Sequence, residues 1–350
     1  MEFGLFIEFP WHEGATETGV FAESFALVDA AEAMGVEAVW VAEYHFDPNR
    51  SVLSAPITIA SAIAARTKRM KIGLGVHVLP LRNPVRVAEE VATLDHISGG
   101  RVDFGVGRSA FPRAYLGYGM AYGESRERFA ECLEVILRAW TNERFSFHGQ
   151  YYQYQDVHVV PKPLQRPHPP IRIGATSADT FALVGHMGYP IFINPSRVFS
   201  LLALAPLIQE YQQAYQDAGH PGDMQIGLRV PVYVAETIEQ AYAQPKESTL
   251  YQMRRLIQVI TASATQSGIG PNDNRLLQAE RLKSMSYEDV VQNMVIYGTP
   301  EMVVDRLRQL QEALGLTQIV YEVNFGCHIP YELQARCLQL MQERVIPHFK

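Results

Sequence analysis

The segment Glu43-Tyr44-His45-Phe46-Asp47 holds the densest group of side chains that could do chemistry. It follows a predicted strand over 37–42, and Glu43, His45 and Asp47 share one face if the chain stays extended. Imidazole titrates near neutrality, so His45 is the best candidate for moving a proton to or from an oxygen atom. A histidine that only hydrogen-bonds its own loop is an equally good interpretation of the sequence.

A second polar group follows a predicted strand over 171–175. Thr176, Ser177 and Thr180 surround the start of a predicted helix over 178–187. The free N–H groups and the positive dipole end of such a helix suit a phosphate. Capping of the helix by Ser177 or Asp179 is the structural alternative.

Two arginines could add charge to this phosphate site. Arg108 follows a predicted strand over 102–107 and offers a planar, permanently charged group. Arg126 lies near the start of the next predicted helix and could point into the same mouth. In the predicted strand over 70–76, Gly73 and Gly75 indicate close approach of a flat ligand or of another backbone.

Short β-rich runs alternate with helical patterns along the whole chain, which predicts parallel βαβ units. Eight such units without a change of composition favour an α/β fold of one domain over residues 1–350, a (β/α)8 TIM barrel with insertions after strands 4 and 7. We expect a hairpin-bearing insertion over about 142–170, a helical pattern over about 238–261 and a mobile lid over about 264–286. A doubly wound open sheet would need a nucleotide-binding fingerprint, but Gly105-Val106-Gly107 lacks the third glycine, and Phe111-Pro112 follows instead of a helix start.

Composition excludes several classes of function. The chain has 350 residues, with 30 Lys and Arg against 37 Asp and Glu, and a net charge of −7. It has no basic run suited to nucleic acid and no apolar stretch long enough to span a membrane. The three cysteines form no close pair, and no secretory signal is visible, so we expect a cytoplasmic protein. The 11 histidines show no closely paired metal-ligand spacing, so we predict no metal site.

Several longer motifs complete the picture: Glu43-Tyr44-His45-Phe46, the stretch 78–90, Leu94-Asp95-His96-Ile97-Ser98-Gly99-Gly100-Arg101, Phe104-Gly105-Val106-Gly107-Arg108 and Tyr297-Gly298-Thr299-Pro300-Glu301. In this combination the chain resembles the bacterial luciferase-like flavin-dependent monooxygenases over essentially its whole length. The resemblance implies a (β/α)8 barrel that takes reduced FMN from a separate NAD(P)H:flavin reductase. It also implies oxygenation of an organic substrate by O2 through a C4a-peroxyflavin, in an enzyme that forms a homodimer.

The resemblance also assigns residues. Positions matching Arg108, Arg126, Ser177 and Thr180 hold the flavin phosphate in the family, and Glu43 and Thr176 fall in the same cofactor site. The bond matching Gly75–Val76 is a cis peptide beside the flavin ring in the luciferase.

Three positions depart from the luciferase. Tyr44 replaces its first, functionally critical histidine, so light emission is not expected. His45 is left as the proton manager, and Tyr44 as a hydrogen-bond donor to a peroxide oxygen. Gly107 replaces a reactive cysteine, and Thr176 replaces an acidic residue, which eases binding of an anionic phosphate.

Alternatives remain open at this point. Related barrels use the deazaflavin F420 for hydride transfer without oxygen. A flavin-binding accessory subunit without activity would also fit the loss of the first histidine. A metal hydrolase is the least favoured alternative. We expect a small, largely apolar substrate, whose identity lies in variable loops.

Overall fold

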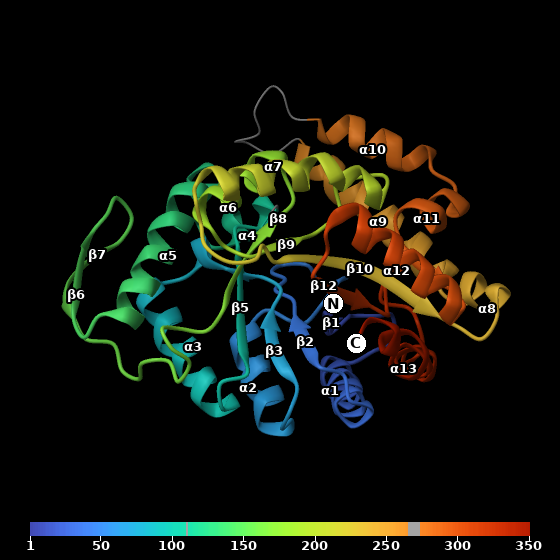
Figure 1. The fold of residues 1–350 in the computed structure, drawn as a ribbon, viewed down its shortest axis with the longest axis horizontal. Helices are drawn as coiled ribbons and strands as arrows, with labels where there is room; N and C mark the ends of the chain where they lie inside the picture. The colour runs from blue at the N-terminus through green and yellow to red at the C-terminus, as the bar shows by residue number, and fades with distance from the viewer. Residues whose placement is uncertain (110, 265–273) are drawn as a thin grey trace.

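Eight parallel strands form a closed barrel at the centre of the molecule, and helices surround it (Figure 1). The computed structural model describes residues 1–109, 111–264 and 274–350. In their order around the barrel, the strands are β1 (Glu2–Ile7), β2 (Ala38–Val41), β3 (Lys71–Leu74), β5 (Val102–Gly107), β8 (Ile171–Ala175), β9 (Ile191–Ile193), β10 (Ile226–Val234) and β12 (Gln318–Glu322). Since β12 pairs in parallel with both β1 and β10, the ring closes. The predicted (β/α)8 barrel is confirmed, and the open-sheet alternative is wrong.

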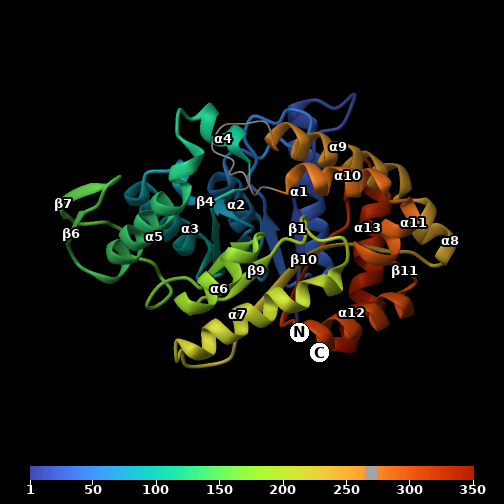
Figure 2. The same ribbon diagram turned by 90° about the horizontal axis from the view of Figure 1, so that it is seen from above.

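The main helices lie outside the barrel. They are α1 (Glu17–Met34), α2 (Pro56–Arg66), α3 (Pro84–Ser98), α5 (Ser125–Thr141), α6 (Ala178–Met187), α7 (Ala205–Asp217), α12 (Pro300–Leu314) and α13 (Tyr331–Leu340). A glycine in the left-handed conformation ends several of them, including Gly35 after α1 and Gly99 after α3. The two termini lie together (Figure 2), where the amino group of Met1 donates to the Phe349 carbonyl at 3.4 Å.

The remaining helices and strands lie in the connections. They are β4 (His77–Val78), α4 (Pro112–Gly117), the hairpin strands β6 (Phe145–His148) and β7 (Gln153–Val157), α8 (Ile238–Ala243), α9 (Lys246–Ala264), α10 (Arg275–Ser284), α11 (Tyr287–Asn293) and β11 (Ile296–Gly298). Single turns occur at Leu79–Leu81, Tyr122–Glu124, Leu201–Leu204, Met341–Val345 and Ile346–Phe349.

The structure corrects three details of the predicted elements. The helical pattern over 238–261 belongs to two helices, α8 and α9, because Pro245 between them has no N–H for a helical hydrogen bond. Pro112 opens α4, where the sequence predicted no helix start; proline is compatible with a first turn, since that N–H has no partner in a helix. The strand predicted over 70–76 ends at Leu74 and pairing resumes at β4.

The predicted insertions have different outcomes. β6 and β7 form an antiparallel hairpin inside the stretch 142–170, and it projects beside α5 (Figure 1). Of the lid predicted over 264–286, residues 265–273 lie outside the described residues, and Arg275–Ser284 forms α10. Among the residues that the structure describes, no helix is long and apolar enough to cross a membrane.

The interior of the barrel is filled unevenly. Trp40 and Phe192 stack at 5.1 Å between ring centroids and fill its middle. Trp40 fits because Gly73 faces it: a Cβ at Gly73 would lie 2.3 Å from the indole ring. Gly75 after β3, Gly107 in β5 and Gly174 in β8 line a cavity inside the barrel.

Candidate active site

A cavity opens at the carboxyl ends of the strands, the end of a (β/α)8 barrel where active sites form. Its empty volume is about 1040 Å³, counting the open mouth. Residues from the ends of seven barrel strands line it. The predicted site residues among them are Glu43, Tyr44, Gly75, Val76, Arg108, Thr176, Ser177 and Thr180, whereas His45 and Arg126 are not in the lining. The barrel therefore brings together most of the side chains that the sequence singled out.

One wall of the cavity is nearly bare backbone. Gly75, Gly107 and Gly174 lie next to one another there, and Val76 is the side chain that covers them. A Cβ added to Gly107 would lie 2.5 Å from Cγ2 of Val76, and one added to Gly174 would lie 3.0 Å from its Cγ1. The peptide bond between Gly75 and Val76 is cis, as the family resemblance implied. Such a wall lets a flat ring approach the backbone closely.

Another part of the lining can bind an anion. Ser177 is the N-cap residue of α6, but its side chain accepts no hydrogen bond from the helix backbone. Its hydroxyl instead lies 2.9 Å from that of Thr180. The capping alternative for Ser177 is therefore wrong, and the helix N-terminus with its two hydroxyls faces the cavity. Thr176 and Arg108 line the same cavity, and a phosphate there would meet N–H groups, hydroxyls and one guanidinium.

Arg126 is placed differently from the prediction. Its side chain is 54% exposed and lies 3.7 Å from the carboxylate of Asp179. Because Asp179 is in the first turn of α6, Arg126 stands near the anion-binding end, yet outside the cavity lining. In this structure Arg126 forms a surface ion pair with Asp179, and it does not line the cavity where the phosphate is expected.

Glu43 belongs to a buried cluster of polar side chains. Its carboxylate lies 2.7 Å from both His45 and His77 and 3.0 Å from Arg82, and it has no exposed surface. Burial would raise the pKa of Glu43, but His77, His45 and Arg82 outweigh burial and hold it well below its ordinary value. The carboxylate is thus an anchor for the loop after β2 and for the β4 segment. Glu43 also lines the cavity, and its predicted role in cofactor binding stays a prediction.

His45 lies behind the cavity wall. Its Nε2 faces Glu43 and its Nδ1 lies 3.2 Å from the hydroxyl of Tyr118. Both ring nitrogens are therefore engaged, and the residue is only 7% exposed. Proton transfer by His45 stays a prediction. In this geometry His45 would act through Glu43 or Tyr118, the two residues that its ring nitrogens contact. Among the residues described, no group of three or more His, Cys, Asp or Glu side chains could hold a metal ion.

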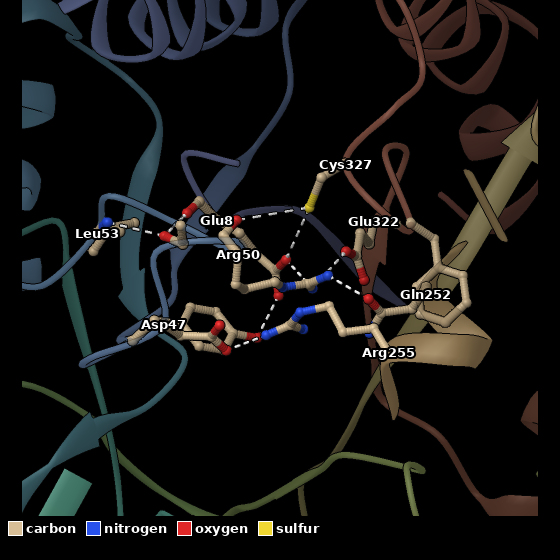
Figure 3. A network of polar contacts seen from close by, with 12 residues as sticks. Glu8, Asp47, Arg50, Leu53, Gln252, Arg255, Glu322 and Cys327 are labelled. Atoms are coloured by element: carbon tan, nitrogen blue, oxygen red, sulfur yellow. Dashed lines mark hydrogen bonds and ion pairs between the residues drawn. The ribbon is translucent and has the colours of Figure 1, made fainter. Parts of the chain in front are cut away.

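Tyr44 joins a buried network of four charges, called the charge quartet below. Its members are Glu8 after β1, Arg50, Arg229 in β10 and Glu322 at the end of β12. Tyr44 donates to Glu8 at 2.6 Å. Arg229 lies 3.0 Å from Glu8 and 2.6 Å from Glu322. Arg50 pairs with Glu8 and lies 3.7 Å from Glu322. Figure 3 shows Arg50 between these two carboxylates, with Gln252 beside it.

The quartet decides what Tyr44 can do. Its hydroxyl hydrogen is used by Glu8, so the predicted donation to an oxygen in the cavity would require breaking this bond. Burial and the charge of Glu8 raise the pKa of Tyr44 above its ordinary value, so the phenol stays protonated at neutral pH. Burial raises the pKa of Glu8, but Arg50 and Arg229 outweigh burial and lower it below its ordinary value. Glu8 therefore stays ionised between its two arginines, whereas burial raises the pKa of Glu322 above its ordinary value.

The sequence reasoning missed the members of the quartet. Glu8 and Glu322 do carry a signal, because each is a carboxylate at the carboxyl end of a strand, the position where such barrels place chemistry. Arg229 lies within a β-rich run and could be placed only once the inward face of β10 was known. Arg50 carries no local signal, since it lies in a loop and reaches the site through the path of that loop.

Comparisons with known proteins show which family the chain is similar to. Residues 1–317 match the family model described as luciferase-like monooxygenase. The chain is 25% identical to the oxygenase component of flavin-dependent trigonelline monooxygenase from Acinetobacter baylyi, over 100% of this chain and 96% of that protein. It is also 25% identical to F420-dependent glucose-6-phosphate dehydrogenase from Amycolatopsis mediterranei, over 91% of this chain and 92% of that protein.

A solved structure shows the same fold. The oxygenating constituent of 3,6-diketocamphane monooxygenase from Pseudomonas putida, a type II Baeyer-Villiger monooxygenase in complex with FMN, superposes with a TM-score of 0.80. The match covers 99% of this chain and 98% of that chain, at 21% identity.

Proposed function

This chain belongs to the luciferase-like monooxygenase family, and on that premise we propose that it binds reduced FMN in the cavity and uses O2 to oxygenate a small, largely apolar organic molecule. The observation that carries the proposal is the pairing of a bare glycine wall with an anion-binding helix N-terminus inside one cavity. A flat ring joined to a phosphate is the ligand that needs both.

The residues present fit this cofactor. The wall of Gly75, Gly107 and Val76 would face the ring, and Ser177, Thr180 and the guanidinium of Arg108 would hold the phosphate. When bound, reduced FMN supplies the electrons that activate O2.

The protein's own contribution is positioning, shielding and control of protons. Phe6, Phe111 and Phe192 line the cavity and limit the access of water to the ring. Arg229 and the Tyr44–Glu8 pair place hydrogen-bonding groups at the same end of the barrel. His45 acts as a positioning residue, because it holds the carboxylate of Glu43 and through it the loop that carries Tyr44.

The phosphate end can be tested by comparing FMN with riboflavin, which has the ring but no phosphate. Arg108→Ala removes a charge-assisted contact of about 1.5–3 kcal/mol, which corresponds to roughly a tenfold to hundredfold weaker affinity for FMN. The affinity for riboflavin should stay unchanged. Anaerobic titration with each reduced flavin measures both values, and an equal loss for riboflavin would show that Arg108 does not contact the phosphate.

The oxygenase activity is tested by mixing the anaerobic complex with oxygenated buffer. We expect the absorbance of oxidised flavin to appear more slowly with the protein than without it, because the cavity limits the access of water to the bound ring. Candidate substrates are then scored by incorporation of ¹⁸O from labelled O2. Binding without any change in the reoxidation rate would favour the accessory-subunit alternative.

F420-dependent hydride transfer is the second candidate, favoured by the similarity to an F420-dependent dehydrogenase over nine-tenths of the chain. F420 also joins a flat ring to a phosphate, so the cavity suits both cofactors. Titration with reduced F420 under the same conditions separates them, since the cofactor of the enzyme should bind at least tenfold more tightly than the other.

Three further expectations from the sequence analysis remain part of this proposal. They are a separate NAD(P)H:flavin reductase as the source of reduced FMN, a homodimer, and a cytoplasmic location. The first is supported by the name of the trigonelline relative, which is one component of its monooxygenase. Sizing of the purified protein tests the second.

A further inference from the structure

A second cavity adjoins the candidate active site on the far side of Arg229. Its empty volume is about 580 Å³, counting the open space at its mouth. Asn194, Ser196 and Arg229 line both cavities, so these residues form the junction between them. We call the second cavity the apolar chamber.

The walls of the apolar chamber are mostly hydrocarbon. Leu201, Met253, Leu256, Met294 and Phe325 surround it, and they come from the connection after β9, from α9, and from the segments after α11 and β12. Among the described residues, only two charged side chains line it, Arg229 and Glu322. They form an ion pair at 2.6 Å, so the chamber as a whole is electrically neutral.

The junction offers hydrogen-bond donors. The carboxylate contacts of Arg229 both use Nη2, and its buried Nε has no hydrogen-bond partner among the residues that the structure describes. The guanidinium also stacks on Phe6, with Cζ 4.0 Å from the ring centroid, so its position is fixed. Asn194 accepts the Ser196 N–H at Oδ1, which leaves its amide nitrogen to donate.

The charge balance restricts what can bind at this junction. A carboxylate ligand would lie beside Glu322 and compete with it for Arg229, and an ammonium ligand would face the guanidinium of Arg229. A neutral oxygen acceptor meets neither penalty. The hydroxyl of Tyr44 cannot serve it as donor while bonded to Glu8, so Arg229 and Asn194 are the donors at hand.

We propose that the apolar chamber binds the hydrocarbon body of a neutral substrate, and that Arg229 and Asn194 donate hydrogen bonds to its carbonyl-type oxygen at the junction. The substrate class is thus an apolar ketone or a compound of like polarity. The identification of this ligand as the substrate rests on the proposed function, but the binding site itself does not.

The test compares 2-nonanone, nonanoate and nonylamine, which share a chain length and differ in charge. Isothermal titration of the full chain, with and without saturating FMN, measures each affinity. We expect 2-nonanone to bind at least tenfold more tightly than either ion. Equal or tighter binding of nonanoate would overturn the charge argument.

Variants locate the site. Leu256→Trp fills the chamber and should weaken 2-nonanone at least tenfold, with less than a twofold change in the affinity for FMN. Leu277→Trp is the matched control, because Leu277 lies on α10 with 70% exposure, and it should change neither affinity. Arg229→Lys keeps the positive charge beside Glu8 and Glu322 but loses donors, so it should weaken the ketone severalfold. Unchanged ketone binding in Leu256→Trp would overturn the proposal.

The outcomes separate this inference from the proposed function. Binding of 2-nonanone without binding of FMN would reject the FMN-dependent function and leave the chamber in place. Binding of FMN with no ketone binding in either state would reject the chamber and leave the function in place.

Discussion

Replacement of Gly107 by alanine tests the glycine wall most directly. Gly107 ends β5 and faces Val76 across the cavity wall, and a Cβ there would lie 2.5 Å from Cγ2 and 3.4 Å from Cβ of that valine. Carbon atoms in contact prefer about 3.5–4.0 Å, so the shorter contact overlaps by about 1 Å or more. Val76 would have to move toward the space that we assign to the flavin ring.

The expected cost follows from this overlap. Inserting a carbon into packed surroundings costs about 1–3 kcal/mol, and we expect Gly107→Ala to lower the free energy of unfolding by that amount. Val76→Ala alone removes two partly buried methyl groups, worth about 1 kcal/mol. If the clash is the whole cost of Gly107→Ala, the double variant should be no less stable than Val76→Ala, which means a coupling of about 1–3 kcal/mol.

Urea denaturation of the wild type, Gly107→Ala, Val76→Ala and the double variant gives the free energies of unfolding. Titration with FMN gives their affinities. We expect the affinity for FMN to fall in Gly107→Ala and to recover in the double variant. Gly123→Ala is the matched control, because a Cβ at Gly123 meets no atom within 4 Å. Additive stability losses, or a double variant that binds FMN no better than Gly107→Ala, would refute the reasoning.

Three further predictions concern the polar residues. Glu43→Gln should lower the free energy of unfolding by about 3–5 kcal/mol at pH 7. Because the folded state holds the pKa of Glu43 below its ordinary 4.5, this stabilisation is present above about pH 4.5 and is lost as the pH falls below it. Urea denaturation should therefore show the gap to wild type narrowing below that pH, and a constant gap would contradict the assignment. His45→Ala should leave the affinity for reduced FMN within twofold and lower product formation, whereas a large loss of flavin binding would place His45 at the cofactor. Arg126→Ala should change the affinity for FMN by less than twofold, since Arg126 is half exposed and paired with Asp179; a tenfold loss would show that it turns into the cavity when FMN binds.

The pattern of strands and helices followed from the sequence because it depends on local periodicity. Alternating β-rich and helical runs, glycines such as Gly35 and Gly99 at helix ends, and Asn83-Pro84 at a helix start are local signals that neighbouring residues decide. The closed barrel then follows from the count of parallel units. Boundaries were less certain, as in α8 and α9, where a single proline divides one helical pattern.

The phosphate end of the site was also readable in the sequence. Arg108 follows directly on β5, and Ser177 and Thr180 lie at the start of the helix after β8. Because the carboxyl ends of parallel strands meet at one mouth, these residues, far apart in the chain, had to converge. The same rule does not fix where a long side chain points. Arg126, near the start of α5, was expected to point into the mouth, but it turns outward to an ion pair with Asp179.

Only the tertiary structure decided the partners of the buried charges. His45 looked like the group facing the cavity, but the path of its loop buries it against Glu43 and Tyr118. Arg50 and Arg229 carry no local signal, yet the closure of the barrel brings them from separate segments against Glu8 and Glu322. Local sequence determines which backbone forms. Which side chains share a buried space is a property of chain segments that meet only when the barrel closes, and for that reason the sequence alone located the mouth but not its charge quartet.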